Sequence, residues 1–386
     1  MDSLPDAILQ CILSRITHAR DVASCNCVSK RWKDSTPYIK TLYFPRSSFD
    51  NPSPSGEDGD SIIKRMVSRV VKLEELIVYS PFSPDGLASW LSLVGQSLLQ
   101  LELRMDNLAD NEDLHESPSK LDYVGAAKNL VSLKLWGVLI MRSPKWDVFP
   151  NLQNLEIVGA RLDDAVLSAV LHSCPALTRL LLLGCEGVRS VQGCSWIRVP
   201  ETKHLRKLSI SNSAGRVYMV DFGNLSALEF LCMRGIQWCW DAICKMLKMA
   251  SEVNHLFMKV EFTGDYDALQ PFPEIDFVDF FNTHQKLRKF DMHGAMFAAL
   301  CQKNSLKHVD SEFVIPYLEE VVITVRSPLN AEQKMSTLES LLKYGKSLRS
   351  MVIKILEMKS SHSSADDFFD EICRFTYMNH NIVRIQ

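Results

Sequence analysis

Cysteine and histidine side chains lie close together at two places where they could bind a metal or act as nucleophiles. Cys25 and Cys27 are separated by one residue, and so are His172 and Cys174. A zinc site needs a wider Cys pair and further ligands, and no His pair lies near Cys25 and Cys27 in the sequence. On a helix, side chains two positions apart do not face each other, so His172 and Cys174 do not form a Cys–His pair. We predict that both pairs are structural, with Cys25 and Cys27 as small buried residues of a helix.

Acidic side chains gather in two segments that could bind Ca²⁺. Asp265 and Asp267 lack the Gly and the bidentate Glu of an EF-hand loop. The acidic run over 105–118 is typical of a solvated loop. The sequence also contains none of the glycine-rich phosphate-binding motifs and no G-x-S-x-G nucleophile motif. We therefore predict no catalytic residue, no metal and no cofactor.

Composition limits the class of protein further. Of the 386 residues, 46% are hydrophobic and 23% are charged, which is enough to bury a sizeable core. The formal net charge of -3 argues against a nucleic-acid-binding protein. The beginning of the sequence has no signal-peptide pattern, and no apolar run reaches the roughly 20 residues that a membrane span needs. Eleven irregularly spaced cysteines are then expected to be reduced thiols, in the cytoplasm and/or the nucleus.

A repeated pattern occupies most of the sequence. Units of the form L-x-x-L-x-L, with other apolar residues as substitutes, recur every 22 to 34 residues or so. They begin at Leu73, Leu98, Leu130, Leu152, Leu177, Leu205, Leu228, Val253, Leu287, Leu318 and Leu348. The spacing is near the roughly 20–29 residues of a leucine-rich repeat, with loop insertions.

Each unit combines a strand pattern with space for a helix. Amphipathic helices are predicted over 163–174, 240–251 and 331–345, and the C-terminal segment suits a capping helix and a last strand. Stacked units of this kind predict an α/β fold, a horseshoe with a parallel sheet on the concave face and helices on the convex face. The stretch 186–204 contains Gly187, Gly193 and Pro200 and predicts no helix, which indicates either a shortened or a missing repeat.

The first 45 residues have a different pattern. Ile8, Ile12 and Ile16 line one helical stripe, and Asp21 is placed to cap a second helix that carries Val22, Cys25 and Val28. A third short segment holds Trp32 and ends near Pro37. Three short helices bury only a thin core, so the excess of apolar residues indicates a face that binds a partner.

This block closely resembles the F-box motif. "LPDAILQCILSRI" resembles its Leu-Pro start and first helix, and "VSKRW" resembles its Val-x-x-x-Trp signature, although Ala7 and Thr17 depart from the common Glu and Pro. With the repeats, the resemblance covers nearly the whole chain and implies an F-box/leucine-rich-repeat protein of the type abundant in plants. Such proteins are substrate receptors of SCF ubiquitin ligases, which dock on a Skp-type adaptor and through it on cullin. The resemblance implies these adaptor-facing residues: Leu4, Pro5, Ile8, Ile12, Leu13, Val28 and Trp32.

The domain organisation that follows is an F-box over residues 1–45 and a repeat array with its cap over 62–386. Residues 46–61 are rich in Ser, Pro, Gly and Asp and are predicted to be flexible. They either tether the two parts or form a loop inside the first repeat.

The strand register predicts which side chains could bind a target. Residues two, four and six positions after the first residue of each unit should point to the concave face. Most are polar, but the middle units place six apolar side chains there: Trp136, Val158, Leu181, Leu183, Phe230 and Phe257. Exposed apolar groups of this kind commonly anchor a partner. A register error of one residue would instead place them all in the core.

Three functions are compatible with this organisation. The first is an SCF substrate receptor, which contributes placement of a target rather than chemistry. The second is an F-box scaffold that binds a protein without promoting its ubiquitylation. The third is a small-molecule co-receptor, which the mixture of Lys, Arg, Asp and Glu on the concave positions disfavours. The target itself is unknown.

Overall fold

The computed structural model describes most of the chain. The described residues are 4–49, 57–105, 119–140, 142–162, 164–187, 194–199, 202–212, 216–222, 225–262, 273–302, 312–356 and 363–386. The predicted acidic loop, apart from Met105, and the segment with Asp265 and Asp267 lie outside the described residues. The chain forms two compact units, Met1–Val188 and Arg189–Gln386, and each is considered by itself.

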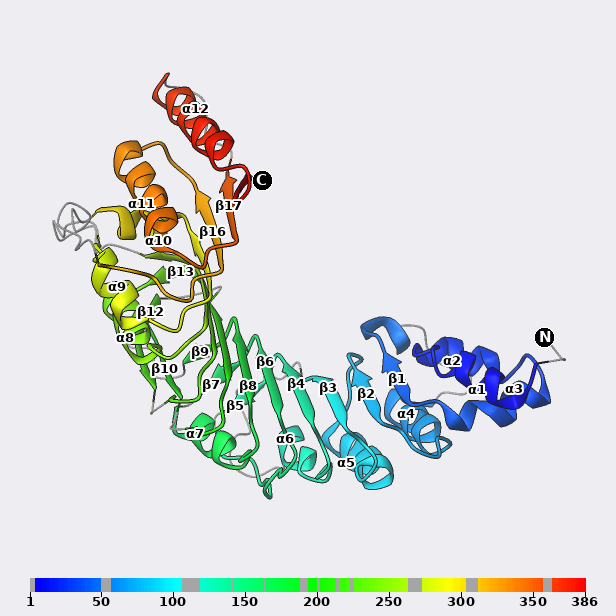
Figure 1. Cartoon of the computed structure of the whole chain (residues 1–386). Coiled ribbons are helices and arrows are strands. Elements are labelled where there is room, and N and C mark those ends of the chain that lie inside the picture. Colours follow the sequence, from blue (N-terminus) through cyan, green and yellow to red (C-terminus); the bar gives the residue numbers. More distant parts are fainter. Residues whose placement is uncertain are drawn as a thin grey trace. The chain divides into compact units, whose positions relative to one another are not determined.

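The first unit begins with three short helices (Figure 1). They are α1 (Asp6–Leu13), α2 (Ala19–Cys25) and α3 (Lys30–Ser35), followed by a 3₁₀ turn over Thr36–Tyr38. The cap of α2 is not Asp21, as predicted, but His18, whose Nδ1 accepts a hydrogen bond of 3.2 Å from the backbone N of Arg20. His18 precedes the helix with extended backbone, whereas Asp21 already lies in its first turn.

A parallel sheet follows, and every neighbouring pair of its strands is parallel. Its order in this unit is β1 (Thr41–Phe44), β2 (Glu75–Val78), β3 (Gln100–Arg104), β4 (Ser132–Trp136), β6 (Asn154–Val158) and β8 (Arg179–Leu183). The helices between these strands all lie on one side of the sheet (Figure 1). They are α4 (Gly59–Val67), α5 (Pro84–Val94), α6 (Lys120–Val124) and α7 (Asp164–His172).

The first strand of the sheet lies at the end of the predicted F-box range. Thr41–Phe44 falls within the predicted F-box, yet β1 pairs with β2, and the backbone N of Tyr43 donates to the carbonyl of Thr17 at 2.8 Å. The segment 46–61 therefore connects two strands of one sheet, and its described part contains a 3₁₀ turn over Arg46–Phe49 and the start of α4. The second alternative, a connection inside the first repeat, describes this region.

A glycine ends three successive strands of the first unit. Gly137, Gly159 and Gly184 have φ of 59°, 59° and 58°, a left-handed conformation that glycine adopts without a steric penalty. Each turn leads into a short strand, and these strands form a second parallel sheet: β5 (Leu139–Ile140), β7 (Arg161–Leu162) and β9 (Glu186–Gly187).

The second unit repeats the same architecture. Its sheet order is β11 (Lys207–Asn212), β13 (Phe230–Trp238), β14 (His255–Phe262), β15 (Lys289–His293), β16 (Glu320–Val325), β17 (Ser350–Ile355) and β18 (Val383–Ile385). Its helices are α8 (Trp240–Met249), α9 (Phe277–Thr283), α10 (Gly294–Gln302), α11 (Ala331–Tyr344) and the C-terminal α12 (Ser363–Met378). The helices predicted over 163–174, 240–251 and 331–345, and the C-terminal helix with a last strand, are confirmed.

Strands replace a helix in the irregular stretch. In place of a helix, β10 (Cys194–Val199) pairs with β12 (Arg216–Phe222), and Val217 of β12 pairs with Trp238 of β13. The prediction that 186–204 carries no helix is confirmed for its described residues.

Burial follows the predicted strand register. In β4, β6 and β8 alternate residues are buried, as for Leu180 and Leu182, which are each 1% exposed, while Leu181 and Leu183 are half-buried on the opposite face. The concave face is the side of the sheet that carries the residues two, four and six positions after the first residue of each unit. Two of those positions are exceptions in the second unit, since Cys232 and Thr324 are buried.

Candidate functional site

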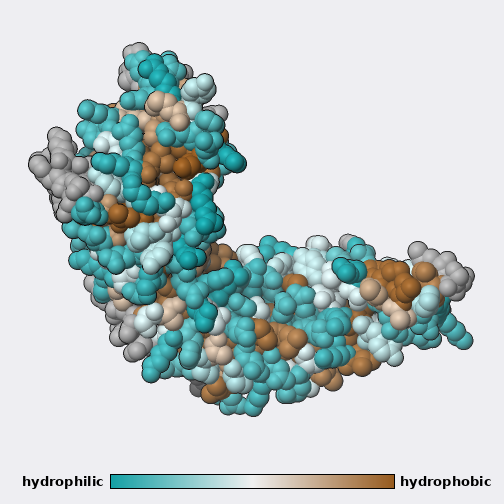
Figure 2. All heavy atoms as spheres, viewed as in Figure 1, coloured by the Kyte–Doolittle hydropathy of each residue, from teal (hydrophilic) through white to brown (hydrophobic). Residues whose placement is uncertain are grey.

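The three N-terminal helices carry exposed apolar side chains. Ile8 and Ile12 on α1 are 48% and 41% exposed, and Val28, in the turn after α2, is 60% exposed. Figure 2 shows a hydrophobic patch where these helices lie. Large aliphatic side chains exposed together on a small domain indicate a surface that binds a protein.

A buried layer lies behind that surface. Leu9 and Leu13 on α1 are each 1% exposed, and Val22 and Cys25 on α2 are also buried. Leu13 was predicted to face the adaptor, and this is wrong, because its side chain belongs to the core. On α1, Ile8 and Ile12 share one stripe, and Leu9 and Leu13 are each turned one residue further around the helix. Cys27 was predicted to be buried and is instead exposed.

Polar contacts hold the segments of this surface together. Arg31 on α3 places its Nε 2.7 Å from Asp6 Oδ1 at the start of α1, and also contacts the carbonyl of Leu4. Thr36 Oγ1 donates a 2.6 Å hydrogen bond to Asn26 Oδ1. Leu4 and Trp32 are half-buried and Pro5 is exposed. The exposed apolar residues are thus presented by helices whose relative positions are fixed.

The concave face of the first unit carries a network of aromatic and charged side chains. Trp136 Nε1 donates a 2.8 Å hydrogen bond to Glu102 Oε1, and Lys134 Nζ lies 3.2 Å from the same oxygen. The hydroxyl of Tyr79 also donates to Glu102. Burial, reinforced by this hydrogen bond and the charge of Glu102, raises the pKa of the Tyr79 hydroxyl above its ordinary value. Tyr79, Trp136 and Lys134 thus all direct their donors to one carboxylate, that of Glu102.

Aromatic rings connect this network to the helical block. His18 and Tyr43 are in edge-to-face contact with ring centroids 5.9 Å apart, Tyr43 and Tyr79 follow at 5.5 Å, and Tyr79 and Trp136 at 6.1 Å. Such edge-to-face pairs are each worth about 0.5–1.5 kcal/mol beyond their buried area. The row therefore fixes the concave face relative to α2.

The predicted target-binding residues fall into two groups. Trp136, Val158 and Leu183 form one row, because the register pairs Trp136 with Val158 and Val158 with Leu183, and Leu181 lies beside this row. Phe230 and Phe257 belong to the second unit. All six side chains are half-buried. The structure brings the first four together and places the other two on adjacent strands, β13 and β14.

Sequence reasoning did not identify the histidines around the two phenylalanines. Phe230 contacts His255 at a centroid distance of 4.7 Å, and Phe257 lies 5.4 Å from His293 and 4.5 Å below the guanidinium of Arg234. Burial, with the nearby Lys289 ammonium, lowers the pKa of His255. The strand register could have identified them, since His255 and His293 occupy concave positions.

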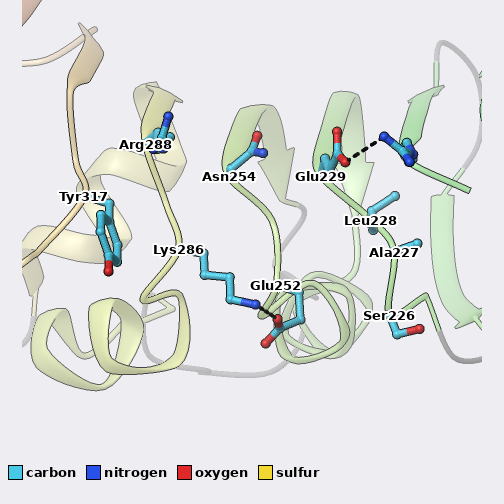
Figure 3. A pocket seen from close by; sticks show the side chains of 10 residues that line it. Ser226, Ala227, Leu228, Glu229, Glu252, Asn254, Lys286, Arg288 and Tyr317 are labelled. Carbon is cyan, nitrogen blue, oxygen red and sulfur yellow. Dashed lines mark hydrogen bonds and ion pairs between the residues drawn. The ribbon is translucent and has the colours of Figure 1, made fainter.

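A hollow lies where the strands of the second unit begin (Figure 3). It has a volume of about 530 Å³. Two ion pairs line it, Arg206 with Glu229 at 3.3 Å and Lys286 with Glu252 at 2.5 Å. Arg288 also lines the hollow, and its guanidinium lies 3.8 Å from Glu319, which does not, so the lining carries three cations and two carboxylates.

The pair His172 and Cys174 shows no sign of catalysis. Cys174 is buried, and burial raises the pKa of its thiol to about 12. His172 is exposed, with its Nδ1 2.7 Å from the carbonyl oxygen of Ser168. Within the described part of the chain, no three His, Cys, Asp or Glu side chains gather as metal ligands, and no helix is long and apolar enough to cross a membrane.

Comparison with known proteins identifies the family of the chain. A family model described as F-box-like matches residues 1–43, and one described as the LRR repeats of FBD-associated F-box protein At5g56370 matches residues 87–250. F-box protein At1g10780 of Arabidopsis thaliana is 61% identical, with both chains covered over 100% of their length. The chain belongs to the F-box/leucine-rich-repeat family.

More distant members of the family match only in part. Putative F-box protein At3g58860 of Arabidopsis thaliana is 27% identical over 47% of this chain and 41% of its own length. FBD-associated F-box protein At4g10400, from the same plant, is 24% identical over 60% of this chain and 55% of its own. In this F-box protein α1, α2 and α3 form the F-box, and the parallel sheet with its helices forms the leucine-rich repeats. Proteins of this family are generally non-catalytic adaptors.

Proposed function

We propose that this protein is the substrate-recognition subunit of an SCF-type cullin ubiquitin ligase, itself without catalytic activity. Its F-box would dock on a Skp-type adaptor and through it on cullin, and its leucine-rich repeats would bind a protein target. The observation that carries the proposal is the exposure of Ile8, Ile12 and Val28 over a buried layer of Leu9 and Leu13. These side chains are exposed in the chain alone and are available to a partner.

The concave face supports the second half of the proposal. Trp136, Val158, Leu181 and Leu183 supply apolar anchors on rigid strands, and binding energy at protein interfaces is concentrated in such anchors. The ubiquitin-transfer chemistry would belong to other subunits, and this chain would contribute proximity. We place it in the cytoplasm or nucleus, where such ligases work.

The test is adaptor binding by Ile8→Asp, with Leu93→Asp as the matched control. Leu93 on α5 is 50% exposed, close to the 48% of Ile8, but lies outside the F-box. Both charges stay solvated in the free protein, so both variants should fold. Only Ile8→Asp should lose the adaptor in co-purification, since burying an uncompensated polar or charged group at an interface costs several kcal/mol.

Two results would count against the proposal. Full adaptor binding by Ile8→Asp would remove the docking assignment. Adaptor binding without cullin in the same pull-down would favour the alternative of a scaffold, or a co-receptor, that does not promote ubiquitylation. The point variant is preferable to deletion of residues 1–45, because that deletion would also remove β1 and expose the edge of β2.

A further inference from the structure

A hollow of about 200 Å³ lies on the concave face of the first unit. Its lining comes from four adjacent strands, β2, β3, β4 and β6. The register places Glu75 beside Gln100, and Ile77, Glu102, Lys134 and Glu156 in one row. The hollow is therefore built on paired strands and not on loops, so its shape is set before any partner binds.

Its charge is unevenly distributed. Three carboxylates, those of Glu75, Glu102 and Glu156, line it with one ammonium, that of Lys134. Lys134 Nζ lies 3.2 Å from Glu102 and 3.8 Å from Glu156, and Arg179 adds a contact of 3.6 Å to Glu156. Lys134 is thus shared between Glu102 and Glu156, and Arg179 adds positive charge beside Glu156 alone.

Glu75, on the first of the four strands, is the carboxylate of this hollow that has no ion pair among the described residues. Glu75 Oε2 accepts a 2.9 Å hydrogen bond from Thr41 Oγ1, and no lysine or arginine of the described residues is ion-paired with Glu75. Glu75 and Glu102 stand on neighbouring strands, offset by two residues, which places their Cβ atoms about 7–8 Å apart or somewhat closer. Glu102 Oε1 already accepts from Tyr79 and Trp136, so a cation between the two strands would meet Glu75 and the second oxygen of Glu102, with the apolar Ile77 beside it.

An apolar row borders the hollow. Trp136, Val158 and Leu183 lie two residues further along their strands than Lys134, Glu156 and Leu181, a distance of about 6–7 Å. An extended segment can place one side chain in the hollow and another on this row.

We propose that the hollow receives an arginine side chain of the target, with its guanidinium between Glu75 and Glu102 and a neighbouring apolar residue on the row. Arginine suits this position because its planar guanidinium donates several hydrogen bonds to carboxylates at once. An acidic segment would meet Glu75 and Glu102 with like charge. This inference rests on the proposed function, since it describes the segment of the target that the repeats would bind.

The test uses the purified full chain with its Skp-type adaptor and a displayed library of random peptides. We expect enrichment of peptides with an arginine within a few positions of a large apolar residue. One enriched peptide is then labelled, and its affinity is measured by fluorescence anisotropy for the unchanged protein, for Glu75→Gln and for Glu320→Gln. Glu320 is the matched control, because it occupies the same position in its own repeat and lies in the second unit.

We expect Glu75→Gln to bind the peptide about tenfold more weakly, the typical value of one charge-assisted hydrogen bond. Glu320→Gln should bind as the unchanged protein does, and a peptide with neutral citrulline in place of arginine should lose a similar factor. Equal affinity for the citrulline peptide, equal affinity of Glu75→Gln, or a library that yields no arginine-containing binder would overturn the proposal. The adaptor pull-down is read separately, so loss of docking and loss of arginine recognition are distinguished.

Discussion

The indole of Trp136 donates a 2.8 Å hydrogen bond to Glu102 across two neighbouring strands, and the Lys134 ammonium lies 4.8 Å from the centre of the same ring. One aromatic side chain is thus held by a carboxylate and a cation while part of it stays exposed on the concave face. A ring fixed in this way can bind a partner without first losing rotamer freedom.

Two substitutions of Trp136 should separate its apolar surface from its hydrogen bond to Glu102. Trp136→Ala removes the apolar surface, so target capture with the proteasome blocked should fall by a factor of about 30 or more, equivalent to roughly 2 kcal/mol. Trp136→Phe keeps a ring but loses the hydrogen bond to Glu102, and should retain most of the capture. Adaptor binding, measured on the same preparations, should be unchanged in both. Undiminished capture by Trp136→Ala would show that the ring is not an anchor.

Leu181 and Leu180 test the register of β8 directly. Leu181 is half-buried on the concave face and Leu180 is 1% exposed in the core. Leu181→Asp should therefore keep a cooperative thermal transition near that of the unchanged protein and lose target capture. Leu180→Asp should bury a charge and destabilise the first unit by about 4 kcal/mol or more. The reverse ranking of the two melting temperatures would contradict the register.

Gly159 tests a turn that ends a strand, and Gly125, at the end of helix α6, is its control. Gly159 has φ of +59°, and no atom lies within 4 Å of the place that a Cβ would occupy, so alanine there meets backbone strain and no clash. Gly159→Ala should reduce the free energy of unfolding by about 1–2 kcal/mol. Gly125 ends α6 with φ of -58°, and a Cβ there would make contacts of 3.5 Å or more. Gly125→Ala should be neutral in the same denaturation experiment, and equal losses would point to a cause other than φ.

His284 should make the second unit less stable in mild acid. The ring is 2% exposed, with Nδ1 2.8 Å from the carbonyl of Phe280 and Nε2 3.1 Å from that of Leu247. Burial lowers the pKa of this histidine below its unfolded value of about 6.5. Below that pH the unfolded state binds the proton more readily, so stability is fully present above pH 6.5 or so and is lost as the pH falls, by at most about 1.4 kcal/mol per pH unit.

The measurement is denaturant unfolding at about pH 7.5 and about pH 5.5, for the unchanged protein and for His284→Gln. The variant should lose less stability between the two conditions. The pKa of His255 is also lowered by burial, so part of the dependence should persist in the single variant. An identical pH dependence in both proteins would show that His284 does not titrate in this range.

The sequence alone determined the repeated strand and helix units, the F-box signature and, apart from Cys232 and Thr324, the face of the strand residues. Periodicity carries this information, since a parallel repeat sheet must bury alternate residues such as Leu180 and Leu182. The same alternation predicts Leu181 and Leu183 on the concave face, where the folded chain has them.

Only the tertiary structure decided which side chains are buried between elements, which strands pair and which charges lie together. Leu13 was predicted on the docking surface and lies in the core. The pattern of apolar residues gives a broad stripe on α1, and only the packing of the neighbouring helices selects which part of that stripe they bury. The strand Thr41–Phe44 joined the sheet because its pairing with Glu75–Val78 depends on residues more than 30 positions away. For the same reason the uncompensated charge of Glu75 is a property of the folded sheet, since three other strands supply the lysine and carboxylates around it.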